Sequence, residues 1–298
     1  MTDLRAALDS PTAALRGIAL MVFGSMLLTL NDAILKWLVA DYPVGQLIFL
    51  RAWFVAIPIA VIAWRSGGLS SLRVVDPRGH VIRALFVICS SYSFMTALRF
   101  MPFPEATAIL FASPLFVTAL SVPVLGEKVG WRRWTAVCVG FAGVLLIIRP
   151  TGDAFQMAAL LVLASALFGG LRDLTTRRIT ARESSTAILV TTTTIVGLSG
   201  LLSLPVTDWR MPAPADLALL AITGTLMGSA HFCLIECFRQ AEAALVAPFK
   251  YSALLWAGVL GWLMWRHVPD AWAMLGAGIV VASGLYILHR ELHRRRNL

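Results

Sequence analysis

The sequence contains 298 residues, of which 58% are hydrophobic and only 14% are charged, and its formal net charge is +9. A soluble domain carries about a quarter charged residues, so the composition excludes an ordinary soluble protein. The positive charge does not indicate nucleic-acid binding, because the basic residues lie in short breaks between apolar runs and form no basic stripe. The sequence therefore predicts an integral membrane protein surrounded by the lipid bilayer.

Ten apolar segments are long enough to cross a hydrocarbon layer of about 30 Å, and short breaks rich in Pro and Gly separate them. The first segment is too long for a cleaved signal peptide, so we interpret it as a retained helix. No break is long enough to hold a soluble domain. The predicted spans are 16–38, 44–64, 80–100, 104–125, 132–149, 154–176, 185–205, 214–238, 242–264 and 270–289.

The distribution of Lys and Arg among the breaks predicts the orientation of the chain. With a cytoplasmic N-terminus, eighteen of the 25 basic residues lie on the cytoplasmic side and five on the other side. Arg51 and Lys250 remain inside spans. Cytoplasmic loops carry an excess of Lys and Arg, so we predict that both termini are cytoplasmic in a bacterial-type inner membrane.

The two halves of the chain repeat a pattern of residues at offsets of 137 to 141 positions. Because each half has five spans, an odd number, the second half must have the opposite orientation in the membrane. We therefore predict an all-α membrane protein in which residues 1–150 and 151–298 form two inverted five-helix repeats, an arrangement that places a substrate near the mid-plane. The matched residues are Asp32 and Lys36 with Asp173 and Arg177, Ala97-Leu98-Arg99 with Cys237-Phe238-Arg239, and Glu105-Ala106 with Glu242-Ala243.

Short motifs occur in a fixed order in both halves. The first half has Ala97-Leu98-Arg99-Phe100, Glu105-Ala106-Thr107-Ala108, Ser113-Pro114-Leu115 and Gly126-Glu127-Lys128. The second half has Ala244-Leu245-Val246-Ala247-Pro248-Phe249-Lys250-Tyr251, Leu255-Trp256 and Ser283-Gly284-Leu285-Tyr286. In order and spacing these motifs resemble the drug/metabolite transporter superfamily, specifically its EamA-like ten-helix members, over residues 16–290. The resemblance implies transport of a small organic solute. One departure is Trp265-Arg266-His267, which stands where the family usually has a second Gly-Glu pair.

An ionisable group in hydrocarbon costs several kcal/mol unless it is paired or hydrated, which makes each one a functional candidate. Asp32 and Arg51 lie at about the same predicted depth, roughly 10 Å below the outer surface at 1.5 Å per residue. We predict that Arg51 binds an anionic group of the substrate, that Asp32 carries a coupling proton and that Asn31 hydrogen-bonds the substrate. A purely structural Asp32–Arg51 pair, or pairing of Asp32 with Lys36, is the alternative.

Lys250 and Tyr251 follow Pro248, which tends to kink a helix. Lys250 lies about 12 Å into the predicted ninth span, a long reach for a side chain that extends back to the interface. We predict that Lys250 and Tyr251 line a substrate cavity, and extension of Lys250 to the cytoplasmic surface is the alternative. Three deeper aromatic residues are further candidates for substrate contact, with helix packing as the alternative: Tyr92, Phe249 and Trp256.

His231 and Glu236 share the predicted eighth span, and a His can relay protons near neutral pH. We include His231 among the substrate-binding residues, with a packed, hydrogen-bonded His as the alternative. Glu236 and the pair Arg172 and Asp173 are predicted to serve proton coupling or gating. Glu105 is assigned to complementing a helix dipole, and Glu127 to a charged cytoplasmic turn. Gly224 and Gly228 have the spacing of a close helix–helix contact.

The sequence favours a secondary active transporter that works by alternating access and is coupled to protons or another gradient. Amino acids, nucleoside- or vitamin-like compounds and carboxylate-bearing solutes are the candidate substrates. No motif for ATP hydrolysis, a Ser nucleophile or a zinc protease is present, and we expect no metal ion or cofactor. An intramembrane enzyme and a channel-like facilitator are the alternatives. Whether the chain forms a homodimer is left open.

Overall fold

The computed structural model describes residues 11–65, 72–125, 130–148, 153–179, 182–240 and 247–296, and helices dominate these ranges. Seven helical segments of the described chain are long and apolar enough to cross a membrane, one of which, Phe103–Pro123, comprises α5 and most of α6; α7 and α9 contain shorter apolar stretches. The helices are α2 (Pro11–Leu38), α3 (Val44–Arg65), α4 (Pro77–Ala97), α5 (Phe103–Leu110), α6 (Ser113–Leu125), α7 (Trp131–Ile148), α8 (Asp153–Ile179), α9 (Ser185–Leu201), α10 (Pro214–Gln240), the 3₁₀ helix η2 (Ala247–Tyr251), α12 (Ser252–Trp265) and α13 (Ala271–Arg296).

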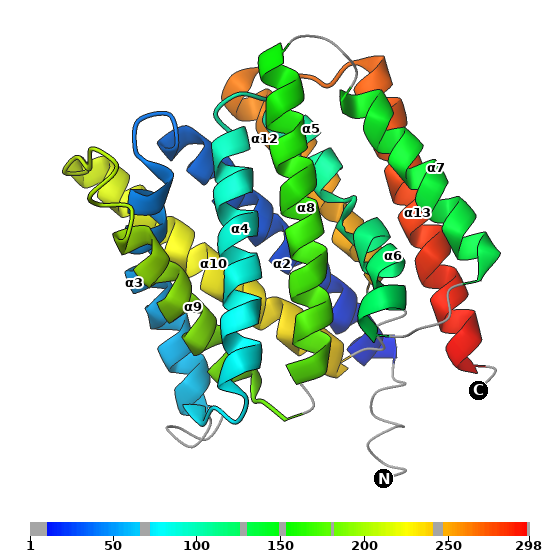
Figure 1. Cartoon of the computed structure of the whole chain (residues 1–298), viewed down its shortest axis with the longest axis horizontal. Coiled ribbons are helices and arrows are strands. Elements are labelled where there is room, and N and C mark those ends of the chain that lie inside the picture. Colours follow the sequence, from blue (N-terminus) through cyan, green and yellow to red (C-terminus); the bar gives the residue numbers. More distant parts are fainter. Residues whose placement is uncertain are drawn as a thin grey trace.

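The helices form one bundle in which α2 begins and α13 ends at the same side (Figure 1). We call this side the terminal face and the opposite side, where α2 ends and α13 begins, the distal face. Large apolar side chains such as Leu255 and Trp53 are more than half exposed on the bundle, which fits a surface that contacts hydrocarbon. Helices therefore correspond to all ten predicted spans.

Two of the spans are discontinuous, which the sequence prediction did not include. The fourth predicted span consists of α5 and α6, which are separated at Phe111 and Ala112. Pro114, near the start of α6, has no backbone N–H and its ring excludes the carbonyl four residues earlier, so α5 ends at Leu110. In the ninth span, η2 precedes α12, and the α-helix begins only at Ser252. Positions 241–246 lie outside the described residues.

The most extensive helix contacts join the first half of the chain to the second. The helix α2 packs against α10, α4 against α8, α3 against α9, and α7 against α13. In addition, α10 packs against α3 and α4 packs against α9. The third helix of each half thus completes a bundle with the first two helices of the other half, while α7 and α13 form a pair at one side (Figure 1).

Small residues allow the helices of these bundles to approach closely. A Cβ atom at Gly224 of α10 would lie 2.5 Å from the Cβ of Phe54, and one at Gly228 would overlap the ring of Pro58. The predicted close contact at Gly224 and Gly228 is therefore confirmed, and its partner is α3.

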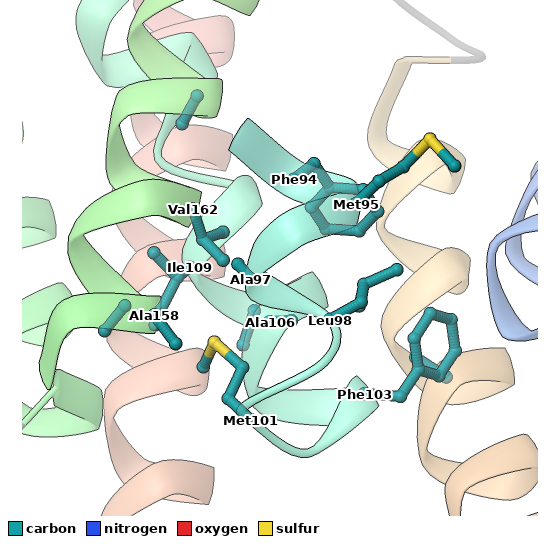
Figure 2. Packing of buried hydrophobic residues seen from close by; sticks show 14 of the residues in the cluster. Phe94, Met95, Ala97, Leu98, Met101, Phe103, Ala106, Ile109, Ala158 and Val162 are labelled. Carbon is teal, nitrogen blue, oxygen red and sulfur yellow. The ribbon is translucent and has the colours of Figure 1, made fainter. Parts of the chain in front are cut away.

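The apolar core is dense around the connection between α4 and α5, near the distal face (Figure 2). Met95, Leu98 and Phe103 from this region are at most 2% exposed, and Ala158 and Val162 of α8 pack against the same cluster. Interiors of this kind are close-packed and resist deformation. The backbone carbonyls of this connection are therefore held in fixed positions.

Each face also has a polar contact that joins the two halves. At the terminal face, Glu183 accepts hydrogen bonds from the backbone N–H groups of Val75 (2.7 Å) and Asp76 (2.6 Å). Its other carboxylate oxygen lies 3.3 Å from Nε2 of His80. Burial opposes the charged carboxylate, but the hydrogen bonds from Asp76, Val75 and His80 outweigh it and lower the pKa of Glu183. We call this contact the terminal clasp.

At the distal face, the hydroxyl of Tyr42 donates a hydrogen bond to the Asp216 carboxylate (2.6 Å) and accepts one from the N–H of Ala213 (3.2 Å). This distal clasp ties the connection between α2 and α3 to the start of α10. The terminal clasp likewise ties the connection between α8 and α9 to the start of α4.

Candidate functional site

The first group of candidate residues lies in the distal half of the bundle. Asn31 and Arg51 are 3% and 7% exposed. The amide of Asn31 donates a hydrogen bond to Oδ1 of Asp32 (2.8 Å), and the charges of Asp32 and Arg51 act on each other. Asp32 is six residues from the end of α2, and Arg51 is seven from the start of α3. Both helix ends are at the distal face, so the two residues lie at a similar distance, about 10 Å, from that face.

Lys36 makes contacts away from Asp32. Its ammonium donates hydrogen bonds to the carbonyl oxygens of Leu98 and Met101, both at 2.8 Å, and lies 5.6 Å from the centre of the Trp265 ring. Lys36 therefore holds α2 against the connection between α4 and α5, while the charge of Arg51 acts on Asp32.

A second charged group lies in the terminal half of the bundle. Arg172 donates from Nε and Nη2 to Oδ1 of Asp173, at 2.9 and 2.8 Å. Arg83 of α4 donates from Nε to the hydroxyl of Thr176 (2.8 Å) and from Nη1 to the hydroxyl of Thr192. The sequence alone did not identify Arg83 as a candidate, because it lies in the first turn of the third predicted span (80–100) and was counted with the basic residues of the cytoplasmic side. The helix begins at Pro77, which puts Arg83 inside the bundle.

His231 of α10 connects the two groups electrostatically. The charges of Arg51, Arg83 and Arg172 all act on its ring, and its Nδ1 is 2.7 Å from the carbonyl oxygen of Met227. We call Asp32, Arg51, Arg83, Arg172, Asp173 and His231 the central charge cluster. With a neutral His, the cluster has three cations and two anions. A group of three guanidinium side chains suits a ligand with an anionic group.

Three further buried polar atoms have no hydrogen-bond partner within the described part of the chain: Oδ1 of Asn31, Oγ of Ser252 and Nε1 of Trp256. They come from α2 and α12, which pack against each other. Buried polar atoms are nearly always hydrogen-bonded, and leaving one unpaired costs about 1–3 kcal/mol. One acceptor, one hydroxyl and one donor are thus available to a bound solute. Asn31 and Trp256 were predicted candidates, whereas Ser252 was not.

The breaks in the fourth and ninth spans meet through an aromatic contact. The rings of Phe111 and Tyr251 have centroids 5.1 Å apart, and the Tyr251 hydroxyl occupies the position that a Cβ would take at Gly284. Tyr251 therefore packs between the two discontinuous spans and α13. Phe249 and Lys250, its neighbours in η2, are exposed.

The remaining predicted residues lie at the edges of this region. The hydroxyl of Tyr92 donates a hydrogen bond to the carbonyl oxygen of Ser199 (3.2 Å), which links α4 to α9. Glu236 is half-buried on α10, on the terminal side of His231. Gly126, Glu127 and Lys128 lie outside the described residues.

A further polar group lies at the distal face. Glu105 is in the first turn of α5, as its assignment to the helix dipole requires. Its Oε1 atom also lies 2.7 Å from Nε2 of His267, which follows α12. Beside this pair is a cavity of about 330 Å³, whose lining includes Lys36, Arg99, Trp265 and His267. This contact could not be predicted from a local pattern, because the two residues are 162 positions apart.

Apolar helices of membrane-spanning length, with charges and unpaired polar atoms held inside their bundle, define a multi-pass membrane protein with a polar interior. The sequence matches the EamA-like transporter family over residues 15–149 and 156–288. The chain therefore belongs to this family of drug/metabolite transporters, and the predicted resemblance is confirmed.

Named relatives cover nearly the whole chain. A riboflavin transporter of Rhizobium johnstonii is 29% identical over 96% of this chain and 95% of its own length. An S-adenosylmethionine uptake transporter of Rickettsia prowazekii is 27% identical over 95% of this chain and 96% of its own. A pseudopaline exporter of Pseudomonas aeruginosa is 26% identical over 90% and 94%. These relatives support a small-molecule transporter.

A protein of known crystal structure has the same fold, with a TM-score of 0.66 over 97% of this chain and all of the other chain. The two sequences are 19% identical, so this likeness concerns the fold alone.

Proposed function

We propose that the protein is a secondary active transporter that moves a small organic solute with an anionic group by alternating access. The central charge cluster carries this proposal, because it places three arginines, Arg51, Arg83 and Arg172, within the described helices. Ionisable groups at membrane depth mark substrate or ion pathways. The named relatives act on riboflavin, S-adenosylmethionine and pseudopaline, which are small organic solutes. We place the substrate of this chain in the same broad class.

The cluster assigns a role to each group. Arg51 and Arg83 bind the anionic group. A guanidinium has five N–H donors, and Arg83 uses two of its nitrogens to bond threonine hydroxyls, so further donors remain for the ligand. Asn31, Ser252 and Trp256 hydrogen-bond the rest of the solute. The further proposed substrate contacts are Tyr92, His231, Phe249, Lys250 and Tyr251, and the proposed coupling or gating residues are Asp32, Arg172, Asp173 and Glu236.

We propose further that residues 1–150 and 151–298 are inverted repeats. The counterparts of α2, α3 and α4 in the second half are α8, α9 and α10. The contact of α2 with α10 therefore corresponds to that of α8 with α4, and the contact of α3 with α10 corresponds to that of α9 with α4. Each half also breaks its fourth span. Asp32 is six residues from the distal end of α2, and Asp173 is six from the terminal end of α8. The cluster would then span the mid-plane with one aspartate towards each face.

The excess of Lys and Arg on the terminal face supports an orientation with this face in the cytoplasm, in a bacterial inner membrane. Under this orientation the distal cavity opens to the outside of the cell. The distal face would be sealed by the packed connection between α4 and α5, whereas the exposed Lys250 in η2 is on the cytoplasmic side.

Flux measurements in proteoliposomes test the proposal. Purified protein is offered riboflavin, S-adenosylmethionine and citrate in turn, with and without a pH gradient. Saturable, gradient-dependent flux of at least one solute is expected, and the variant Arg51→Ala should lose it. Chemical conversion of a solute without flux would indicate an intramembrane enzyme, and flux that does not saturate would indicate a channel. Either result would overturn the proposal.

A further inference from the structure

Glu105 is a buried carboxylate that the central charge cluster does not include. Its side chain is only 7% exposed. One oxygen, Oε1, contacts His267, while the other, Oε2, is buried without a hydrogen-bond partner among the described residues. An ionised carboxylate in such a place has an unpaired, desolvated oxygen, which is costly, and a bound proton removes the charge. Oε2 of Glu105 is therefore an acceptor that the described residues leave open to a bound proton.

His267 provides a path to water for this carboxylate. Its side chain is 35% exposed and lines the distal cavity of about 330 Å³, while its Nε2 atom lies 2.7 Å from Glu105. An imidazole can accept a proton on one ring nitrogen and release one from the other. A proton that binds Nδ1 of neutral His267 makes the ring cationic. Transfer of the Nε2 proton to Oε1 of Glu105 then neutralises the acid and leaves a neutral His in its other tautomer.

Other charged groups around the pair keep fixed positions. Lys36 of α2 acts electrostatically on Glu105, yet its ammonium is held by two backbone carbonyls. Arg99, before α5, donates a hydrogen bond to the carbonyl oxygen of Tyr42 (2.6 Å). Arg266, next to His267, lies over the ring of Trp262, and Asp270 caps the start of α13. The proton transfer from His267 to Glu105 thus needs none of these groups to titrate.

The same pair connects the two halves of the chain at the distal face. Glu105 is on α5 of the first half, and His267 follows α12 of the second. The helices touch beside the pair, since a Cβ at Gly261 would lie 2.5 Å from Cγ of Pro104 and the rings of Phe103 and Trp265 are 6.1 Å apart. A change of charge at Glu105 therefore alters a contact that holds the distal ends of α5 and α12 together.

We propose that Glu105 and His267 form a proton-binding site at the distal face, where the coupling proton of transport enters or leaves. The inference rests on the proposed transport function and names the coupling ion and its second binding group. It adds to Asp32 a second carboxylate, one of whose oxygens has no hydrogen-bond partner among the described residues and which reaches the distal cavity through His267.

A solute-free measurement tests the protonation directly. Infrared difference spectra of the protein in nanodiscs, recorded across a pH titration, should contain a protonated-carboxyl band that disappears in Glu105→Gln. The matched control is Asp208→Asn, which removes an exposed carboxylate from the connection between α9 and α10 at the same face and should leave the band in place. A band that persists in Glu105→Gln overturns the proposal, whatever the transport assays give.

Flux measurements then separate coupling from transport. With riboflavin, S-adenosylmethionine and citrate as probes, Glu105→Gln should lose accumulation driven by a pH gradient and the proton flux that accompanies it. It should retain exchange of labelled for unlabelled solute at equal pH, and His267→Gln should slow the proton flux. Exchange by the wild type without proton flux would refute the coupling site and leave transport intact. Absence of both in the wild type would refute the proposed function and this inference with it.

Discussion

Trp256 allows a direct test of whether the unpaired polar atoms inside the bundle are reserved for the solute. Its indole N–H is buried without a hydrogen-bond partner in the described structure. The substitution Trp256→Phe removes this donor and keeps an aromatic ring in place. If the donor serves the solute, the variant should fold normally and bind the solute less tightly.

The size of both effects follows from the environment of the N–H. In the empty protein an unpaired buried donor costs about 1–3 kcal/mol, and its removal offsets part of the packing lost with the smaller ring. Thermal stability should therefore change by less than about 1.5 kcal/mol, the range for swaps of similar volume. A lost hydrogen bond to a neutral solute atom costs about 1 kcal/mol, and one to a charged atom about 1.5–3 kcal/mol. The expected rise in KM is roughly tenfold.

The assay is initial flux against solute concentration in proteoliposomes, together with thermal unfolding in detergent. Trp262→Phe is the matched control, because Trp262 is on the same helix and is 48% exposed. KM should rise only in Trp256→Phe. An unchanged KM in a well-folded Trp256→Phe protein, or an equal rise in both variants, would refute the reasoning.

Three further predictions follow from other parts of the structure. Arg51→Ala and Lys250→Ala should each abolish solute flux while membrane fractionation shows normal insertion; normal flux in both would show that the proposed site is wrong. Glu183→Gln should lower the melting temperature at neutral pH. The folded-state pKa of Glu183 is depressed below its ordinary value of 4.5, so its contribution is present above that pH and lost in more acidic solution, where the melting curves of variant and wild type should converge. Gly228→Ala should lower stability by about 1–3 kcal/mol, because the added methyl group overlaps Pro58, and an unchanged melting temperature would contradict that contact.

The existence and order of the helices could be predicted because apolar length is a local property of the sequence. The start of α4 shows how a local signal can be missed. Asp76 caps this helix by accepting a hydrogen bond from the N–H of Gly79, and Pro77 occupies its first turn, a pairing typical of helix starts. A helix beginning there moves Arg83 from the first turn of the predicted span to the second, away from the end where it was counted with the cytoplasmic residues.

The site could be predicted only in part, because most of it depends on contacts between distant residues. Charges inside apolar runs identified Asp32 and Arg51, since burial of a charge requires a reason. The partner of Glu105 could not be predicted, because no local pattern relates it to His267. The sequence also paired Asp32 with either Arg51 or Lys36, and only the position of two carbonyl oxygens near Lys36 decided between them.

The two clasps have a consequence for the synthesis of the chain. The helix α2 packs mainly against α10, which begins at Pro214, so α2 is synthesised long before its principal partner. Until then the polar residues Asn31 and Asp32 of α2 lie in the membrane without their later neighbours Arg51 and α12. The distal clasp, which joins Tyr42 to Asp216, can close only once α10 has been inserted. Folding of the two bundles is therefore a late and joint event, and a chain truncated after the first half would contain neither of them.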